Sequence, residues 1–188
     1  MAGVLFICAT ADGLTRERFD DWYDRVHLPG GMQVPGFRCA VRLREIGEET
    51  VRATGCLYVL SSTAVLDSRA YLNLQAETSA DTASHVADVH LNRLAGDVVE
   101  GNLPSSTQWS QANRLLLAAV TPKGSTAAAT GTSAARVRLS SGAGPSRRYE
   151  GYDLSLRLVG SAADKSGAPP DAFVSWILEP TRIVHTAH

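Results

Sequence analysis

Apolar and polar residues follow a period of two in several short segments of the first hundred residues. Residues 35–45 (PGFRCAVRLRE) alternate strictly, and residues 3–10 (GVLFICAT) and 56–62 (CLYVLSS) are apolar runs of strand length. Successive side chains of a strand point to opposite faces, so such alternation indicates a strand with one buried face. The pattern therefore predicts a strand in each of these segments.

Apolar residues at helical spacing occur between these strands and after them. A second helix is expected over residues 79–99, and a fourth strand near residues 105–111 (SSTQWSQ). The resulting order, β-α-β-β-α, is most of a ferredoxin-like unit. The i, i+3, i+4, i+7 pattern of a first helix with one buried face is carried by Phe19, Trp22, Tyr23 and Val26.

The second half of the chain predicts the same order of strands as the first half, without the helices, although no sequence motif is repeated between the halves. Stretches rich in glycine, serine and threonine stand where helices would be expected, and these residues are poor helix formers. We therefore expect an α+β protein with a ferredoxin-like unit at residues 1–111 and a degenerate, β-rich second unit at residues 112–188. The strand-like segments of the second half are residues 113–122, 135–141, 151–160 and 173–180.

Composition and charge narrow the classes of function. The chain has 188 residues, of which 44% are hydrophobic, and a net charge of −1, so no basic surface for nucleic acid or anionic lipid is expected. No apolar run approaches the roughly 18 residues that span a bilayer. Three cysteines in apolar segments are typical of reduced thiols. We therefore expect a cytoplasmic protein that binds neither nucleic acid nor membranes.

Sequence motifs for cofactors and activated nucleophiles are absent. The chain contains no G-x-S-x-G elbow, no Walker loop and no H-E-x-x-H pair. His85 and His90 are five residues apart, which would spread them around a helix and disfavours a shared metal ion. We therefore expect no metal and no organic cofactor.

Polar and aromatic side chains crowd the end of the first predicted helix. Asp24 and His27 are three residues apart, which places a carboxylate beside an imidazole, as in a general base. The carboxylate would raise the pKa of His27 above its ordinary value of about 6.5. Tyr23, four residues before His27, would present a hydroxyl to the same substrate. These three residues are the candidate catalytic group. The alternative is that His27 interacts only with the carbonyls and the dipole at the helix end.

Candidate substrate contacts come from other elements. His85 is flanked by acidic residues at helical spacing and is either a pocket residue or part of a solvated face. Arg38 and Arg42 are expected on one strand face, where they would hold a carboxylate or an enolate if that face lines a cavity. On an outer face they would be solvated charges. Trp22 is a candidate pocket wall and Tyr58 a candidate hydrogen-bond donor.

The segment at residues 18–44, RFDDWYDRVHLPGGMQVPGFRCAVRLR, resembles the signature of the EthD-like branch of the dimeric α+β barrel proteins. Members of that branch carry an F-x-x-W-Y-x-x-x-H-x-P run, then V-P-G-F, then a strand rich in arginine or tyrosine. Residues 67–77 (DSRAYLNLQAE) are similar to the segment that leads into the family's second helix. The resemblance covers about residues 1–110. The matching residues are Phe19, Trp22, Tyr23, His27, Pro29, Val34, Pro35, Gly36 and Phe37.

The resemblance implies a ferredoxin-like unit whose open sheet face closes against a second unit to form a barrel, within one chain or in a homodimer. It also implies that small aromatic or polyketide-like molecules bind in the cleft between sheet and helices, where His27 matches a recurrent polar residue. The wider superfamily includes cofactor-free oxygenases, cyclases, isomerases and decarboxylases. The fold therefore does not select one activity.

Three functions remain open. The first is a cofactor-independent enzyme that moves protons on an enolisable, ring-bearing molecule, in a cyclisation, isomerisation, elimination or decarboxylation. His27 would be its general acid or base and Asp24 the group that orients His27. The second is a cofactor-free monooxygenase whose substrate reacts with oxygen once deprotonated. The third is a non-catalytic protein that binds a small molecule or supports a partner enzyme.

Overall fold

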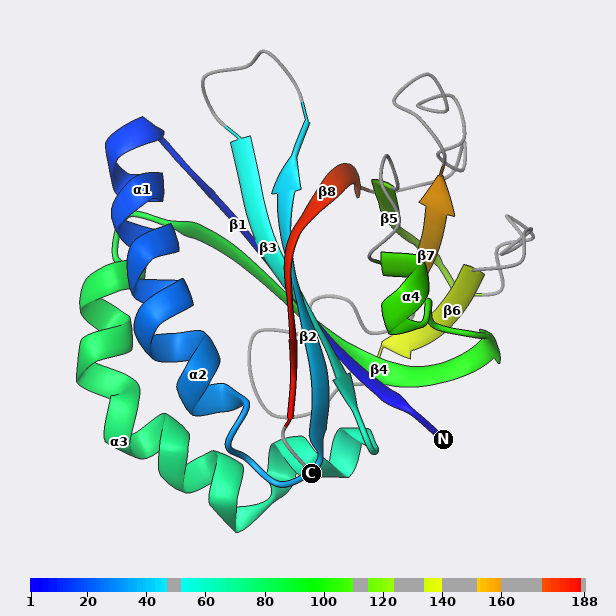
Figure 1. The fold of residues 1–188 in the computed structure, drawn as a ribbon, viewed down its shortest axis with the longest axis horizontal. Helices are drawn as coiled ribbons and strands as arrows, with labels where there is room; N and C mark the ends of the chain where they lie inside the picture. The colour runs from blue at the N-terminus through cyan, green and yellow to red at the C-terminus, as the bar shows by residue number, and fades with distance from the viewer. Residues whose placement is uncertain (47–51, 110–114, 124–133, 140–151, 160–173, 187–188) are drawn as a thin grey trace.

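A closed antiparallel barrel dominates the computed structural model, which describes residues 1–46, 52–109, 115–123, 134–139, 152–159 and 174–186. Within these residues the strands follow the order β1-β3-β2-β8-β5-β7-β6-β4 around the ring (Figure 1). The predicted α+β class with a barrel is therefore confirmed. The strands are β1 (Gly3–Ala11), β2 (Phe37–Glu45), β3 (Arg52–Leu60), β4 (His90–Gly101), β5 (Leu115–Pro122), β6 (Ala134–Leu139), β7 (Tyr152–Val159) and β8 (Val174–His185).

The longer helices cover the side of the barrel that the first four strands form (Figure 1). Three consecutive segments, α1, η1 and α2, make one rod, and α3 runs beside it. None of the described helices is long and apolar enough to cross a membrane. The helical segments are α1 (Gly13–Trp22), the π-helical η1 (Tyr23–His27), α2 (Leu28–Gly31), the 3₁₀-helical η2 (Thr63–Asp67), α3 (Arg69–Val86) and α4 (Ser106–Trp109).

The order of the strands recurs around the ring. The first four strands lie in the order β4-β1-β3-β2, and the last four in the corresponding order β8-β5-β7-β6. The two sets meet where β2 pairs with β8 and where β4 pairs with β6. One chain therefore closes the whole barrel. The predicted unit boundary between residues 111 and 112 lies outside the described residues.

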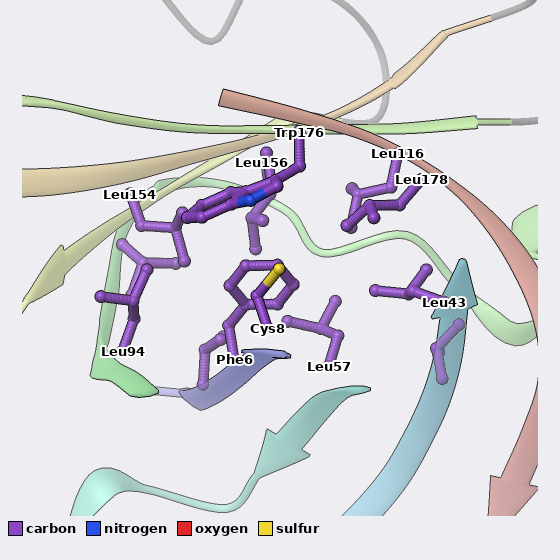
Figure 2. Close-up of a cluster of buried hydrophobic side chains, with 14 of the residues drawn as sticks. Phe6, Cys8, Leu43, Leu57, Leu94, Leu116, Leu154, Leu156, Trp176 and Leu178 are labelled. Atoms are coloured by element: carbon purple, nitrogen blue, oxygen red, sulfur yellow. The ribbon is translucent and has the colours of Figure 1, made fainter. Parts of the chain in front are cut away.

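Side chains from both halves of the chain fill the inside of the barrel (Figure 2). Phe6 from β1 meets Trp176 from β8 edge to face, with ring centroids 5.6 Å apart. Leucines from strands of both halves surround this pair, among them Leu57, Leu94 and Leu154, which are fully buried. A barrel of eight strands is just wide enough to be filled in this way. The middle of the barrel is therefore a packed core.

The structure corrects the expected order of elements after residue 78. Helix α3 ends at Val86, residues 90–101 form strand β4, and residues 106–109 form helix α4 instead of a strand. Strand β4 lies between β1 and β6 and buries apolar residues on both of its faces. Leu94 packs inside the barrel, whereas Leu91 and Ala95 pack toward the helices. Burial on both faces hides the period of two that would have identified the strand.

A π turn changes which residues the first helical rod buries. The N–H of Leu28 bonds to the carbonyl of Tyr23, five residues back, instead of four. The extra residue rotates the end of the rod, so Val26 is 52% exposed although helical spacing predicts it to be buried. Leu28 takes the buried place, and His27 lies at the edge of the same face.

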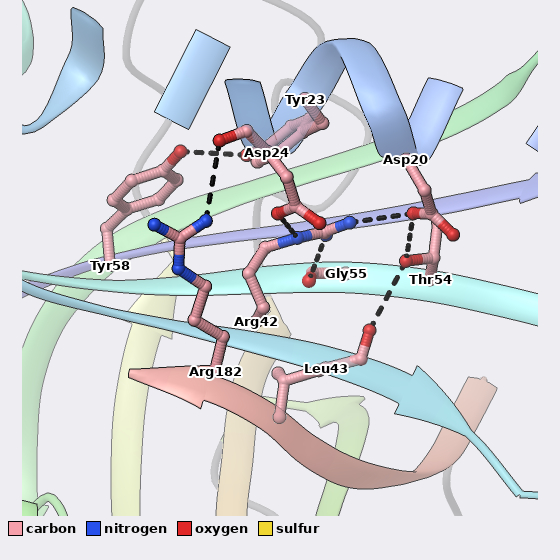
Figure 3. Close-up of polar contacts among 9 residues, drawn as sticks. All are labelled: Asp20, Tyr23, Asp24, Arg42, Leu43, Thr54, Gly55, Tyr58 and Arg182. Atoms are coloured by element: carbon pink, nitrogen blue, oxygen red, sulfur yellow. Dashed lines mark hydrogen bonds and ion pairs between the residues drawn. The ribbon is translucent and has the colours of Figure 1, made fainter. Parts of the chain in front are cut away.

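Arg42 joins this rod to the sheet (Figure 3). Its side chain is almost completely buried, and its Nε and Nη2 atoms lie 2.7 Å from carboxylate oxygens of Asp24 and Asp20. Its Nη1 donates to the carbonyl of Gly55 at 2.6 Å, and its guanidinium carbon lies 4.6 Å from the Tyr23 ring centre. One cation on β2 therefore holds β3, α1 and η1 together.

We expect Arg42→Met to lower the free energy of unfolding by about 3 kcal/mol, the lower end of the range for breaking a buried ion pair. The loss is at the lower end because the side chains of Asp20 and Asp24 remain 21% and 38% exposed. Arg44, exposed on the same strand, supplies the control Arg44→Met, which should cost less than about 0.5 kcal/mol. Urea unfolding of both variants measures the difference, and equal stabilities would contradict the bracing role of Arg42.

A substitution at Gly96 would test whether β4 and β6 pack closely where they join the two halves of the barrel. A Cβ atom at Gly96 of β4 would collide with the backbone carbonyl of Arg138 on β6. We therefore expect Gly96→Ala to cost about 1–3 kcal/mol of stability, the usual range for overpacking. Gly13→Ala is the control, because a Cβ atom there meets nothing within 4 Å. Thermal unfolding compares the two, and an unaffected Gly96→Ala protein would show that β4 and β6 do not approach as described.

Candidate functional site

A small cavity lies between the sheet and the helices, in the cleft to which the family resemblance points. Its volume is about 40 Å³, room for about two or three water molecules. Strands β1, β2 and β3 supply one wall, and the rod and α3 supply the other. Its polar lining residues are His27, Tyr58, Tyr71, Gln75 and Thr78, and its apolar ones include Leu5, Ile7, Phe37 and Leu74.

His27 enters this cavity from the π turn. Its ring packs against the rings of Trp22 and Tyr23, with centroids 4.9 and 4.8 Å away. Burial lowers the pKa of His27 to about 4; Asp81 opposes this shift and the Arg42 cation adds to it. The imidazole is therefore neutral at physiological pH and can accept a proton. The expectation that a carboxylate raises the pKa of His27 is corrected, because burial outweighs the nearby negative charge.

The acidic residue that influences His27 is Asp81 of α3. The predicted orienting residue, Asp24, bonds to Arg42 through its carboxylate instead. Asp81 accepts a hydrogen bond from Trp22 Nε1 at 2.6 Å. Trp22 in turn contacts the His27 ring, so a carboxylate, an indole and an imidazole follow one another from α3 to the cavity.

His85 lies on the α3 side of this cluster and does not line the cavity. Its ring stacks on Trp22, with centroids 4.8 Å apart and planes 7° apart. Its Nδ1 lies 2.9 Å from the Asp81 carbonyl oxygen and 3.1 Å from Ser84 Oγ. These contacts place His85 where it can hold the Trp22 ring in position.

Two buried tyrosine hydroxyls bond to one another beside the cavity, and of these two residues Tyr58 lines it whereas Tyr23 does not. The hydroxyls of Tyr23 and Tyr58 lie 2.9 Å apart, and burial raises the pKa of both well above its ordinary value. Both therefore keep their protons near neutral pH, and their mutual bond uses only one of the two. Tyr71 Oη accepts from Gln75 Nε2 at 3.2 Å and from Arg93 Nη2 at 3.1 Å, so its own proton can be donated.

Three polar lining residues are missed by the sequence-based prediction. Tyr71, Gln75 and Thr78 occupy positions i, i+4 and i+7 of α3, so they share one helix face. The apolar pattern predicts that the second helix begins near residue 79, which leaves these three residues outside it. A predicted start near residue 69, where α3 begins, would have revealed the face that they share. Tyr71 and Gln75 lie within residues 67–77, the segment that resembles the family.

Arg38 and Arg42, which are predicted to share one face of a strand, lie in different places. The register between β2 and β3 shifts between Phe37 and Cys39, so Arg38 lies at an irregularity of the strand. Arg38 is exposed at one end of the barrel, whereas Arg42 is buried under the rod. The shared face expected from strict alternation is therefore broken, and neither arginine lines the cavity beside His27.

Metal-binding potential is low in the part of the chain that the structure describes. No group of three or more histidine, cysteine, aspartate or glutamate side chains there is arranged to hold a metal ion. Cys8, Cys39 and Cys56 are free thiols, and burial raises the pKa of Cys39 to about 11 and that of Cys56 to about 12. These thiols are therefore protonated near neutral pH and are poor nucleophiles.

No protein-family model matches the sequence, and no curated protein matches it. Solved structures do share its fold. An anthrone oxidase-like protein superposes with a TM-score of 0.63 at 9% identity, over 100% of this chain and 94% of that chain. A "putative monooxygenase" from Lactobacillus acidophilus NCFM superposes with a TM-score of 0.54 at 8% identity, over 99% and 97%. A mutant chlorite dismutase from Candidatus Nitrospira defluvii, in complex with cyanide, gives 0.52 at 7%, over 96% and 91%.

These neighbours share the fold of the dimeric α+β barrel proteins with this chain, and at such low identity they show the fold alone. Their names differ in activity, which is expected when one fold carries several chemistries. The narrower EthD-like assignment stays a prediction.

Proposed function

We propose that this chain is a cofactor-independent oxidase or monooxygenase that removes a proton from an enolisable, ring-bearing molecule, with His27 as the general base. The observation that carries the proposal is the partly buried, neutral imidazole at a cavity lined also by Tyr58 and Tyr71. A neutral imidazole can take the proton, and tyrosine hydroxyls can donate to the oxyanion that forms. The names of two structural neighbours favour oxidation over the other proton-transfer reactions.

The proposed reaction begins at a ring CH₂ group conjugated with a carbonyl. His27 takes one proton, and the C–H electrons pass to the carbonyl oxygen, which accepts a hydrogen bond from Tyr58 or Tyr71. The enolate gives electrons to dioxygen, a C–O bond forms at the former CH₂ carbon, and the imidazolium returns its proton to complete a hydroperoxide. Loss of water then leaves a carbonyl. The CH₂ group and O₂ thus become C=O and H₂O, with dioxygen as the oxidant.

The low pKa of His27 is compatible with this role. Proton transfer creates an imidazolium and an enolate at the same time, and their attraction in a cleft shielded from water offsets the penalty that burial places on the cation. Asp81 supplies further negative charge nearby, because it acts to raise the pKa of His27. Asp24 and Arg42 act indirectly, by holding the rod that carries His27.

Movement of α3 would admit the substrate. A cavity of about 40 Å³ is too small for a ring-bearing molecule, since ligand pockets usually measure about 300–1,000 Å³. Tyr71 is the one buried residue of the 18 in α3, so little apolar contact holds this helix to the sheet. Displacing α3 would widen the cleft beside His27, and its return would exclude water from the enolate.

The recurring strand order supports the finer description of the fold. A degenerate second ferredoxin-like unit, without the helices of the first, would close the barrel as a pseudo-dimer within one chain. This arrangement replaces the second subunit of a homodimer and leaves one cleft in each barrel. The W-Y-x-x-x-H spacing that places His27 at the cleft supports the EthD-like resemblance.

The reaction is tested with anthrone, a ring-bearing ketone with an enolisable CH₂ group, in the presence of ¹⁸O₂. The proposal requires dioxygen uptake and one ¹⁸O atom in the ketone product, above the rate without protein. A parallel anaerobic experiment in D₂O measures exchange at the CH₂ group. Exchange without oxidation would favour the non-oxidative proton-transfer enzyme. Binding without exchange or oxidation, extended over other ring-bearing ketones, would favour the non-catalytic binding protein.

We expect His27→Ala to reduce turnover by about 10²- to 10⁴-fold, the usual contribution of a positioned proton-transfer group. His90→Ala is the matched control, because His90 lies on β4 and does not line the cavity, and it should retain full activity. Initial rates and thermal midpoints are measured on the same preparations. A His27→Ala protein that turns over normally once its folded fraction is counted would refute the role of His27 as base.

The pH dependence provides a separate prediction. Protonation removes the base, so kcat/KM should fall as pH is lowered through about 4, the pKa of His27, and not through the ordinary value near 6.5. Asp81→Asn should shift this inflection to lower pH, because Asp81 acts to raise the pKa of His27. Steady-state kinetics from about pH 3.5 to about pH 8, within the range where circular dichroism shows the folded protein, give both profiles. An inflection near the ordinary value in the parent protein would argue against a buried base.

A further inference from the structure

A second, larger hollow lies at one end of the barrel, on the other face of β2 and β3. Its volume is about 490 Å³, within the usual range for pockets that bind small organic molecules. Cys39 and Val59, which are register partners on β2 and β3, line this hollow. Phe37 and Tyr58, one or two residues away along the same strands, line the cavity beside His27. The two sites are therefore separated by a single layer of sheet.

An arginine and a histidine lie at the rim of this hollow. Arg38 of β2 and His185 of β8 both line it, and the pairing of these two strands brings them together from distant parts of the sequence. The carbonyl of Arg38 accepts hydrogen bonds from N and Oγ1 of Thr186, both at 3.3 Å, which fixes the backbone at this point. Among the described residues that line the hollow, none is acidic. The guanidinium is therefore presented to a ligand without a competing carboxylate in the lining.

An unpartnered hydrogen-bond donor is part of the same lining. Trp109, at the end of α4, is 3% exposed, and its Nε1 has no hydrogen-bond partner among the described residues. A buried N–H without an acceptor is unfavourable, so an acceptor supplied by a ligand would stabilise the complex. Val98, Leu103 and Pro104 add apolar surface beside it.

We propose that this hollow is a second small-molecule site, which binds an organic anion with an aromatic or other apolar body. Arg38 binds the anionic group through charge-assisted hydrogen bonds, the indole N–H of Trp109 donates to an oxygen of the ligand, and the apolar residues contact its body. The site does not depend on the reaction at His27, because it shares none of the residues that line the first cavity.

The test uses 2-naphthoate as the anionic probe and 2-naphthamide as its neutral counterpart. Isothermal titration calorimetry at about pH 7 and about 150 mM salt should show binding of 2-naphthoate at least about tenfold tighter than that of the amide, as charge-assisted recognition requires. Arg38→Met should weaken binding of the anion about tenfold. The control Arg44→Met, an exposed arginine of the same strand that is not in the lining, should leave it unchanged.

Two further variants separate the two sites and the two contacts. Trp109→Phe keeps an aromatic ring but removes the N–H, and should weaken 2-naphthoate binding several-fold while the thermal midpoint reports on folding. His27→Ala should leave the affinity unchanged. The proposal is overturned if 2-naphthoate does not bind at about 1 mM, if the amide binds as tightly, or if Arg38→Met and Arg44→Met bind alike. It is also overturned if His27→Ala abolishes binding, since the probe would then occupy the cleft.

Discussion

The cleft exists in its described form because one buried guanidinium fixes a helix against a sheet. Asp20 and Asp24 lie one turn apart on the rod, and Arg42 bonds to both, so the rod can neither slide nor rotate without breaking an ion pair. The same cation acts to lower the pKa of His27. A single side chain of β2 thus fixes the rod that carries the imidazole, and it adds to the effect of burial, which is the main cause of the low pKa of His27.

The packed interior of the barrel determines where ligands can bind. Phe6 and Trp176 occupy its middle together with leucines from both halves, which fill the space that a channel would need. Ligands can instead bind at the helix-covered face, around His27, and at the end of the barrel, around Arg38. Strands β2 and β3 form the wall between these two places, and each strand sends residues to each side.

Much of the first half is predictable from periodicity, and the exceptions have physical causes. Strands β1 and β2 lie where their patterns predict, whereas β3 begins at Arg52, four residues before the apolar run at residues 56–62. The first helix lies where its pattern predicts, although the π turn exposes Val26. Strand β4 does not lie where its pattern predicts. Both of its faces are buried, so its apolar residues do not alternate with polar ones and resemble those of a helix. Hydrogen bonding across long sequence separations is also invisible to local patterns. For this reason the bond between Asp24 and Arg42, and the role of Asp81 beside Trp22, could be read only from the structure.

The π turn makes the site depend on chain length as well as on residue identity. His27 is the fifth residue after Trp22, and the turn between them holds one residue more than an α-helical turn would. A deletion of Arg25 or Val26 from this turn would restore regular helix and rotate the histidine relative to the sheet, although Trp22, Tyr23, Asp24 and His27 would still be present. In evolutionary comparison, a chain that keeps the tryptophan and the histidine but not the number of residues between them would preserve the motif and lose the geometry.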